Sequence, residues 1–324
     1  MSIDIIIQSL KTRLDKEVAL THPNISRSRI QRDIEAGLVL VNGKLQTEAK
    51  FVVRKGDTIT YNYVPDAPIE PKDLEIKTLY NAHGLLILDK PAGMAVHPGA
   101  GFKGDSLVQM LLYRFKDIRL VGQEGRPGIV HRLDKDTSGV ILIALTPAMY
   151  DHLKHAFLER KVKKEYTALV VGLVEKDHGH ITTPIGKSKK DFRKITADPE
   201  DVLEAKEAHT EYHVIRRFPS NVSSVKELVK QSKTQAGYID GYTLLRLNLH
   251  TGRTHQIRVH MASIGHAVAG DALYGKKSSR PQGLTRQFLH ASKIEVQLPD
   301  GAWVVAESPL PEDLEAVLKY LDNK

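Results

Sequence analysis

The stretch HRLDKDTSGVILIAL, residues 131–145, joins a polar segment directly to an aliphatic run. Leu133 is the only apolar residue of HRLDKDTSG, whereas every residue of VILIAL is apolar. A short, continuous apolar run bounded by turn residues is typical of a strand buried on both faces. The pattern therefore predicts a buried strand whose entrance carries a histidine, an arginine and an aspartate. Charged side chains held at such a position indicate a candidate functional site.

Composition sets the class of protein. The chain has 324 residues, of which 41% are hydrophobic, enough to bury a full core and a second, smaller domain. It contains no cysteine, which excludes disulfides, thiolate catalysis and cysteine-ligated zinc. No apolar run approaches the roughly 18 to 20 residues that span a bilayer, and the stretch MSIDIIIQSLKTR lacks a basic leader. We expect a cytoplasmic protein with no membrane partner.

The formal net charge of +8 is compatible with a polyanionic partner but does not require one. Basic residues gather at 26–32, 159–164 and 186–194. Each cluster, taken singly, is typical of a solvated surface. Charge alone therefore leaves nucleic-acid binding open.

Residues 13–64 have the pattern of a compact helix and hairpin unit. One short helix is expected to end near Pro23, and Ser26 is placed to cap a second helix that ends at Gly37. Ile30 and Ile34 are four residues apart and would face a core. Asn42-Gly43, between alternating apolar residues, predicts a tight hairpin, and a turn and strand close the unit.

The stretches SRSRIQRDIEAGLVLVNG and KGDTI resemble the S4-type RNA-binding domain over about fifty residues. The resemblance implies a small α/β fold whose helical surface binds RNA. Arg27, Arg29 and Arg32 would contact phosphates, which provide affinity but little sequence choice. A helix and hairpin unit with no ligand is the alternative.

The segment VPDAPIEPKD, residues 64–73, is rich in proline and acid and reads as a linker. We therefore expect an N-terminal domain at 1–64, a linker at 65–80 and a larger domain at 81–324. In the larger domain the expected strands outnumber the helices and do not alternate with them, which favours an α+β fold with a mixed sheet. Residues 222–237 are expected to form a surface excursion between two strands.

Three stretches place polar residues inside otherwise apolar segments: LDKPAGMAVHPGAG (88–101), GIVHRLDKDTSGVILI (128–143) and HTGRTHQIRVHMASIGHAVAGDALYG (250–275). DKDTSGV is similar to the haloacid-dehalogenase phosphatase pattern, but there the buried strand leads into the first aspartate, whereas here it follows. The spacing of His250, His255, His260 and His266 fits neither one helical face nor HExxH. We expect no metal site.

Together, HRLDKDTSG, KEYTALVVG (164–172), TGRTHQIRVHMASIGHAVAGDALYG and DKPAGMAVHPGAG resemble the RluA-type pseudouridine synthases over roughly residues 80–300. The one departure is GHAVAGD, where that family commonly has proline after GH. The resemblance implies a catalytic domain with a mixed, largely antiparallel sheet. It also implies isomerisation of uridine to pseudouridine in RNA, a reaction that consumes nothing and needs no cofactor.

By this resemblance Asp134 is the catalytic carboxylate and Tyr166 the aromatic residue that stacks on the target base. A dry pocket would disfavour a charged carboxylate, so an arginine should pair with it. Arg258 is the expected partner and Arg253 the second choice. Whether Asp134 attacks the base, attacks the sugar or removes a sugar proton stays open, because all three routes need the same residue.

Arg132 and His131 flank Asp134 and are expected to help hold flipped RNA or a phosphate; the alternative is that they only tie neighbouring loops together. Structured RNA of the large ribosomal subunit or its precursor is the expected partner of a monomeric enzyme. Transfer RNA is the alternative substrate. A non-catalytic ribosome-assembly factor is the alternative function.

Overall fold

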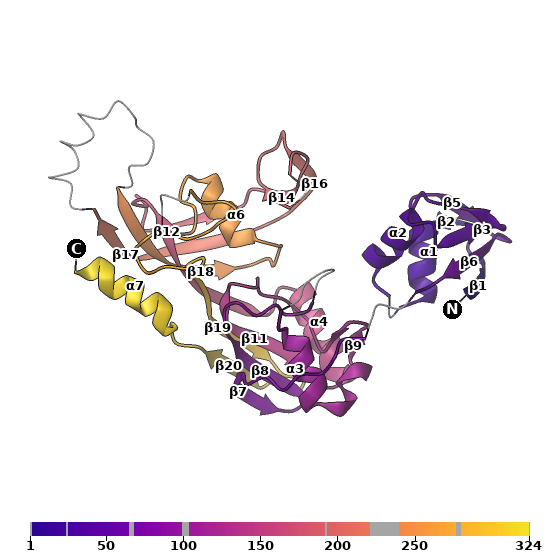
Figure 1. Ribbon diagram of the computed structural model, residues 1–324, viewed down its shortest axis with the longest axis horizontal. Helices are drawn as coiled ribbons and strands as arrows, with labels where there is room; N and C mark the ends of the chain where they lie inside the picture. Colours follow the sequence, from indigo (N-terminus) through magenta and orange to yellow (C-terminus); the bar gives the residue numbers. More distant parts are fainter. Residues whose placement is uncertain are drawn as a thin grey trace. The chain divides into compact units, whose positions relative to one another are not determined.

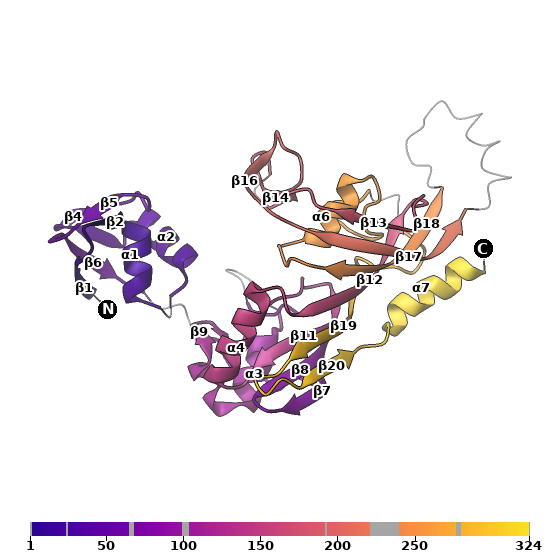
Figure 2. The same ribbon diagram turned by 180° about the vertical axis from the view of Figure 1, so that it is seen from behind.

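The structure is a computed structural model that describes residues 2–23, 25–64, 68–98, 104–191, 193–220, 240–276 and 280–323. Its contacts divide the chain into two compact units, Met1–Asp73 with Val108–Ile129, and Leu74–Leu107 with Val130–Lys324. Figures 1 and 2 label their elements. The boundaries expected at 64 and 80 stay predictions. The expected excursion at 222–237 lies outside the described residues.

The N-terminal part of the first unit packs two helices against short strands. A sheet of order β1-β6-β3-β4 and a ribbon of β2 and β5 are both antiparallel. Ile30 and Ile34 are fully buried in the core, as predicted. The elements are β1 (Ser2–Ile6), β2 (Lys11–Arg13), α1 (Leu14–Thr21), α2 (Arg27–Glu35), β3 (Val39–Val41), β4 (Lys44–Leu45), β5 (Val52–Arg54) and β6 (Thr58–Asn62).

Local sequence explains where these elements begin and end. The Ser26 hydroxyl accepts a hydrogen bond from the Arg29 amide and caps α2, which confirms the predicted helix start. Asn42 and Gly43 both have positive φ, 51° and 74°, as a two-residue hairpin turn between β3 and β4 requires. The segment grouped with this unit contains most of α3 (Leu107–Arg114), the 3-10 helix η1 (Lys116–Leu120), β9 (Gly122–Gln123) and β10 (Arg126–Pro127).

The second unit is built on a nine-stranded sheet of order β13-β17-β18-β12-β19-β11-β8-β7, with β20 paired to β19. Only β11 and β19 run parallel; the other pairs are antiparallel. The predicted α+β class with a mixed, largely antiparallel sheet is confirmed. The strands are β7 (Lys77–Ala82), β8 (Leu85–Lys90), β11 (Ser138–Ala144), β12 (Lys163–Val171), β13 (His178–Ile181), β17 (Thr210–Pro219), β18 (Gly241–Leu249), β19 (Leu289–Gln297) and β20 (Trp303–Glu307).

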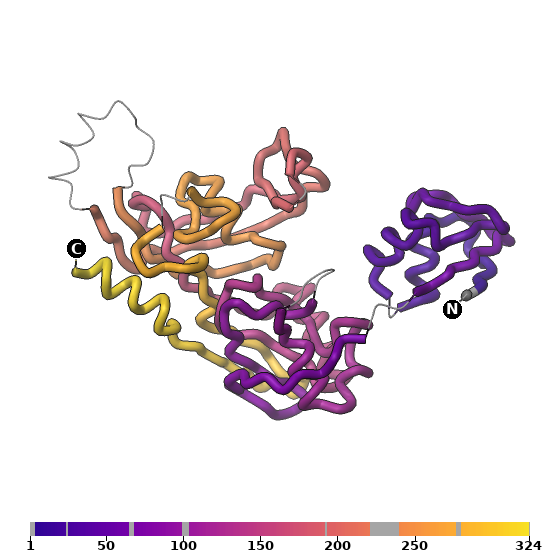
Figure 3. Tube along the Cα trace, in the orientation of Figure 1, coloured from indigo at the N-terminus to yellow at the C-terminus, as the bar shows by residue number. Residues whose placement is uncertain are grey.

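Helices and a small sheet complete this unit (Figure 3). The C-terminal α7 packs Leu314 and Val317 against Leu169 of β12 and Leu244 of β18. The remaining elements are α4 (Pro147–Leu158), α6 (Gln256–Ser263), α7 (Glu312–Asp322), and the small sheet of β14 (Ile185–Ser188), β15 (Ile195–Thr196) and β16 (Val202–Lys206). Within the described ranges, no helix combines the length and apolarity needed to cross a bilayer.

Residues 140–144 of the aliphatic run after HRLDKDTSG lie in β11, and every residue of this strand is buried, as predicted. It lies between β8, with Gly139 opposite Lys90, and β19, with Gly139 opposite Ala291. Gly139 has φ +111°, and a β-carbon there would collide with the Ala291 backbone. Glycine is therefore required where the loop carrying Asp134 enters the centre of the sheet.

Candidate active site

The loop that carries Asp134 is fixed by a buried lysine at the end of β8. Lys90 is fully buried, and its ammonium donates to the carbonyls of Pro91 (2.8 Å), Met94 (2.9 Å) and Lys135 (3.1 Å). Burial lowers the pKa of Lys90 to about 7, although the charges of Asp136 and Asp134 favour its protonated form. A charged amine has three N–H groups for these three carbonyls, so Lys90 ties the residue after Asp134 to the loop after β8.

Hydrogen bonds from Gln287 and Arg286 hold the other side of the same loop. The Thr137 amide donates to the Asp134 carbonyl at 3.1 Å, and the Thr137 hydroxyl accepts from the Gln287 side chain at 2.8 Å. Arg286 donates to the Asp136 carbonyl at 3.1 Å and forms an ion pair with Asp313 of α7 at 2.7 Å. The loop around Asp134 is therefore held by Lys90 on one side and by Arg286 and Gln287 on the other, and Asp313 fixes Arg286.

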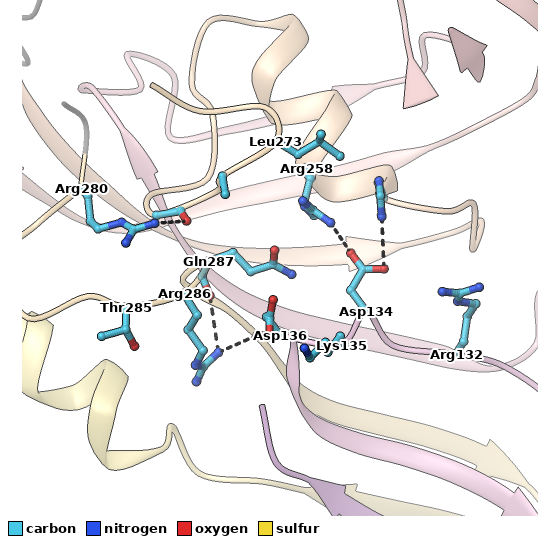
Figure 4. Close-up of a pocket in the computed structure, with 13 residues that line it drawn as sticks. Arg132, Asp134, Lys135, Asp136, Arg258, Leu273, Arg280, Thr285, Arg286 and Gln287 are labelled. Carbon is cyan, nitrogen blue, oxygen red and sulfur yellow. Dashed lines mark hydrogen bonds and ion pairs between the residues drawn. The ribbon is translucent and has the colours of Figure 1, made fainter. Parts of the chain in front are cut away.

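Arg258 of α6 lies between the carboxylates of Asp134 and Asp271, and Figure 4 shows its contact with Asp134. Its Nη1 donates to Asp134 Oδ2 at 2.8 Å, while Nε and Nη2 donate to Asp271 at 2.6 and 2.9 Å. The Asp271 side chain is fully buried, and those of Arg258 and Asp134 are 8% and 17% exposed. The bidentate contact with Asp271 fixes the plane of the guanidinium, so the remaining nitrogen points at Asp134.

Arg258, Asp134 and Asp271 form a triad in which one positive charge lies between two carboxylates. Burial alone would lower the pKa of Arg258, but the hydrogen bonds and charges of Asp271 and Asp134 raise it above its usual value. Burial alone would raise the pKa of Asp271, but Arg258 and the amides of Leu273 and Tyr274 hold it below its usual value. Both groups are therefore charged at neutral pH.

His255 immediately precedes α6 and also faces Asp134. Its Nε2 lies 3.8 Å from Asp134 Oδ1, and its Nδ1 lies 2.8 Å from the hydroxyl of Tyr274. Burial is the main cause that lowers the pKa of His255, and the positive charges of Arg258 and Arg132 lower it further against the opposing effect of Asp134. His255 is therefore a neutral imidazole beside the carboxylate.

A pocket of about 430 Å³ opens at this triad (Figure 4). Arg132, Lys135, Arg280 and Arg286 line it together with Asp134. Cationic side chains therefore outnumber the carboxylates of its wall, which suits an anionic ligand. Its complete lining is Arg132, Asp134, Lys135, Asp136, His255, Arg258, Gly270, Ala272, Leu273, Arg280, Thr285, Arg286 and Gln287.

Tyr166 lies on β12 and is 7% exposed, outside the lining of this pocket. Burial raises the pKa of the Tyr166 phenol, and the charge of Asp134 raises it further, so the two groups are close enough to interact and the phenol is neutral. The structure brings Tyr166 near Asp134, but a base could stack on its ring only if the surrounding side chains moved. Its stacking role stays a prediction.

The other residues predicted to contact RNA differ in their exposure and in their hydrogen bonds. Arg132 is exposed and lines the pocket, on the opposite side of Asp134 from Arg280 in Figure 4. Arg253 does not reach Asp134; its Nε donates to the Glu207 carbonyl at 3.1 Å. His131 accepts a hydrogen bond from the Leu142 amide at 2.8 Å, which ties the loop to β11. Burial lowers the pKa of His131 to about 3, so this imidazole is uncharged.

The arginines of α2 also differ from one another. Arg29 forms an ion pair with Asp33 at 2.7 Å and is 16% exposed, and Arg27 forms one with the buried Asp15 at 3.0 Å. Arg32 is exposed, and its Nε donates to the Ser28 carbonyl at 3.4 Å. Arg27 and Arg32 are therefore both exposed and accessible to a phosphate, while the contacts of Arg29 are largely internal. Their RNA contacts stay predictions.

Asp271 and Lys90 were not singled out from the sequence, and His255 was considered only as a metal ligand, although all three lie in the quoted polar stretches. A signal was present in one case: Asp271 is an acid in an otherwise apolar and glycine-rich segment, AVAGDALYG. Nothing in the spacing shows that Asp271 pairs with Arg258, thirteen residues earlier. Residues 99–101, at the end of the first stretch, lie outside the described residues.

Comparison with known proteins agrees with this architecture. Residues 84–263 match the family model described as RNA pseudouridylate synthase, and residues 12–59 match the S4 domain. An uncharacterized RNA pseudouridine synthase of Aquifex aeolicus is 37% identical over 98% of this chain and 96% of its own. Ribosomal large subunit pseudouridine synthase D of Nitrosomonas europaea is 37% identical over 96% of this chain and 85% of its own.

A solved structure shares the fold over most of this chain. Human RNA pseudouridylate synthase domain containing 1 superposes with a TM-score of 0.56 at 23% identity, covering 79% of this chain and 98% of that one. At this identity the likeness concerns the fold alone. The family model and the full-length relatives go further, and they show that this chain belongs to the RNA pseudouridylate synthase family, isomerases that act on RNA, and that it carries an N-terminal S4 domain.

Proposed function

We propose that this pseudouridine synthase isomerises a uridine of large-subunit ribosomal RNA, with Asp134 as the catalytic carboxylate. The observation that carries the proposal is the position of Asp134 in the pocket wall, where Arg258 holds one carboxylate oxygen at 2.8 Å. A carboxylate kept charged in a partly dry pocket can stabilise or attack an electron-poor sugar or base.

The reaction detaches the uracil from ribose, turns it and rejoins it through a ring carbon. The base loses a proton from that carbon and gains one on the nitrogen it releases, so atoms and electrons balance without a cofactor. The chain then needs to hold the base, keep Asp134 charged and exclude water. The Arg258–Asp271 pair places a positive charge beside Asp134, because Asp271 fixes the guanidinium that faces it.

RNA must reach this pocket with the target nucleotide turned out of its helix, which costs a few kcal/mol. Arg132, exposed at the pocket wall, is proposed to occupy the space left by the base or to hold a neighbouring phosphate. Tyr166 is proposed to stack on the uracil once the pocket opens. The S4 domain is proposed to add phosphate contacts that supply affinity without base choice.

The choice of large-subunit RNA rests on the relatives. The protein from Nitrosomonas europaea is named for the large ribosomal subunit, and its match extends over both the S4 and the synthase regions of this chain. We propose that the enzyme acts as a monomer, because the pocket and its triad are formed by residues of one chain.

The test is a map of pseudouridines in total RNA from cells with and without the gene. The lost positions should lie in large-subunit ribosomal RNA, and the wild-type gene should restore them whereas the Asp134→Asn gene should not. Loss confined to transfer RNA would refute the substrate. Full restoration by Asp134→Asn would refute the catalytic role.

A further inference from the structure

His255 is held in a conformation that ordinary helix formation does not explain. It directly precedes α6 with φ 55° and ψ 19°, in the left-handed region that side chains other than glycine rarely adopt. This conformation is strained and persists where the surroundings impose it, most often at functional sites. Here it places the imidazole in the pocket wall, three residues before Arg258.

Tyr274 is placed to set which nitrogen of His255 carries the proton. The Tyr274 oxygen accepts the amide hydrogen of Ile195 at 3.0 Å and lies 2.8 Å from Nδ1 of His255, to which it can donate its own hydrogen. Burial raises the pKa of Tyr274 to about 12, so the hydroxyl keeps that hydrogen at neutral pH. With Nδ1 accepting, the hydrogen of a neutral imidazole lies on Nε2, the nitrogen that faces Asp134.

Asp271 connects the two groups that flank Asp134. Its Oδ1 accepts from the Tyr274 amide at 3.1 Å and from Arg258 Nη2 at 2.9 Å. One buried carboxylate thus positions both Arg258 and the tyrosine that orients His255. Arg258 meets Oδ2 of Asp134 at 2.8 Å, while His255 Nε2 lies 3.8 Å from Oδ1, so each oxygen has its own partner.

We propose that His255 is a positioning residue for pseudouridine formation, whose Nε2–H orients Oδ1 of Asp134 and whose tautomer is set by Tyr274. The inference rests on the proposed role of Asp134. At 3.8 Å the contact is too long for a hydrogen bond in this structure. Hydrogen bonds of this kind tighten when substrate fills the site. The interaction acts on the orientation of the carboxylate, so it affects turnover more than RNA binding.

The spectroscopic test reads the tautomer directly. In ¹⁵N-labelled full-length enzyme at pH 7.5, His255 should show a protonated Nε2 and an unprotonated Nδ1, and Tyr274→Phe should shift it towards a mixture of tautomers. His260 and His290 are internal references, because the Nε2 of each lies within 3.0 Å of a backbone carbonyl and must donate to it. A protonated Nδ1 with a bare Nε2, or a charged imidazole, in the wild-type enzyme would overturn the proposal.

The kinetic test uses His255→Phe and Tyr274→Phe on an RNA that the wild type modifies. The rate of single-turnover conversion should fall about tenfold or more for His255→Phe and several-fold for Tyr274→Phe, with RNA affinity within about twofold of wild type. Wild-type rates for both variants, with Asp134→Asn inactive, would refute the role of His255 and leave the proposed function standing. An active Asp134→Asn enzyme would instead refute the proposed function.

Discussion

Replacing Arg258 by Met tests the electrostatic design of the site. The substitution keeps a long, unbranched side chain but leaves the fully buried Asp271 without its cation and Asp134 without its partner. Removing one member of a buried ion pair typically costs about 3–5 kcal/mol, because the remaining charge is left unpaired in a dry site. For a unit of this size that corresponds to a loss of roughly 6–20 °C in melting temperature.

Trp303 makes this measurement specific to the catalytic unit. It is the only tryptophan of the chain and lies on β20, so its fluorescence during urea unfolding follows the second unit separately from the S4 domain. Arg258→Met should lower the free energy of unfolding by the amount above at pH 7. Adding Asp271→Asn should restore part of the loss, because the neutral amide no longer requires a cation.

The loss of stability in Arg258→Met should depend on pH, and the pKa of Asp271 determines the direction of that dependence. In the wild type the pKa of Asp271 is held below 3.8, so its contribution is complete above the unfolded pKa and is lost as pH falls through the folded value. In Arg258→Met, burial is the largest influence on Asp271 and is opposed only by the amides of Leu273 and Tyr274, so the pKa of Asp271 rises and the deficit should shrink as pH falls from 7 to 5. A loss below about 1 kcal/mol at pH 7, or a double variant less stable than the single one, would refute the reasoning.

Further substitutions test the loop, the strand and the RNA surface. Burial lowers the pKa of Lys90 to about 7 in the folded protein. From pH 7 towards 10 the unfolded chain therefore keeps a proton on this lysine that the folded chain loses, so the free energy of unfolding should rise with pH. Lys90→Met should flatten that rise in urea titrations at pH 7.5 and 9.5, and an unchanged slope would contradict a buried, titrating amine. Gly139→Ala should unfold the second unit or abolish soluble expression. Gly93→Ala, at a similarly positive φ of +84° but with open space around it, should lower stability much less. Equal losses of stability in the two variants would show that the backbone angle, and not the contact with Ala291, determines the effect. Arg32→Gln should weaken RNA binding and reduce the logarithmic salt slope by about 1 without loss of stability, while Arg29→Gln should mainly destabilise the S4 domain. Filter-binding titrations at several salt concentrations and thermal melts separate the two, and an unchanged salt slope for Arg32→Gln would remove it from the RNA surface.

Local signals in the sequence predicted much of the fold. The apolar run 140–145 predicted the buried β11, Ser26 predicted the start of α2, and Asn42-Gly43 predicted the β3–β4 turn. Each depends on interactions within a few residues. The order of strands in the nine-stranded sheet could not be read in this way, because β11 pairs with β19 about 150 residues later.

The same distinction between local signals and long-range contacts applies to the candidate site. Asp134 was chosen by resemblance, and Arg258 because a carboxylate in a dry pocket needs a cationic partner. Only the fold shows that Arg258, 124 residues away, meets Asp134 while Arg253 turns to Glu207. The bidentate contact of Asp271 and the left-handed backbone of His255 are likewise products of tertiary packing. Residue identity shows that such groups can pair with a carboxylate, but the partner is decided by which segments the sheet brings together.

The most direct test of the central claim is single-turnover pseudouridine formation on a large-subunit ribosomal RNA transcript by Asp134→Asn, with RNA affinity measured on the same samples. Our account predicts no detectable conversion with RNA bound as tightly as by the wild type. Conversion at the wild-type rate would show that the carboxylate held by Arg258 is not the group that performs the reaction.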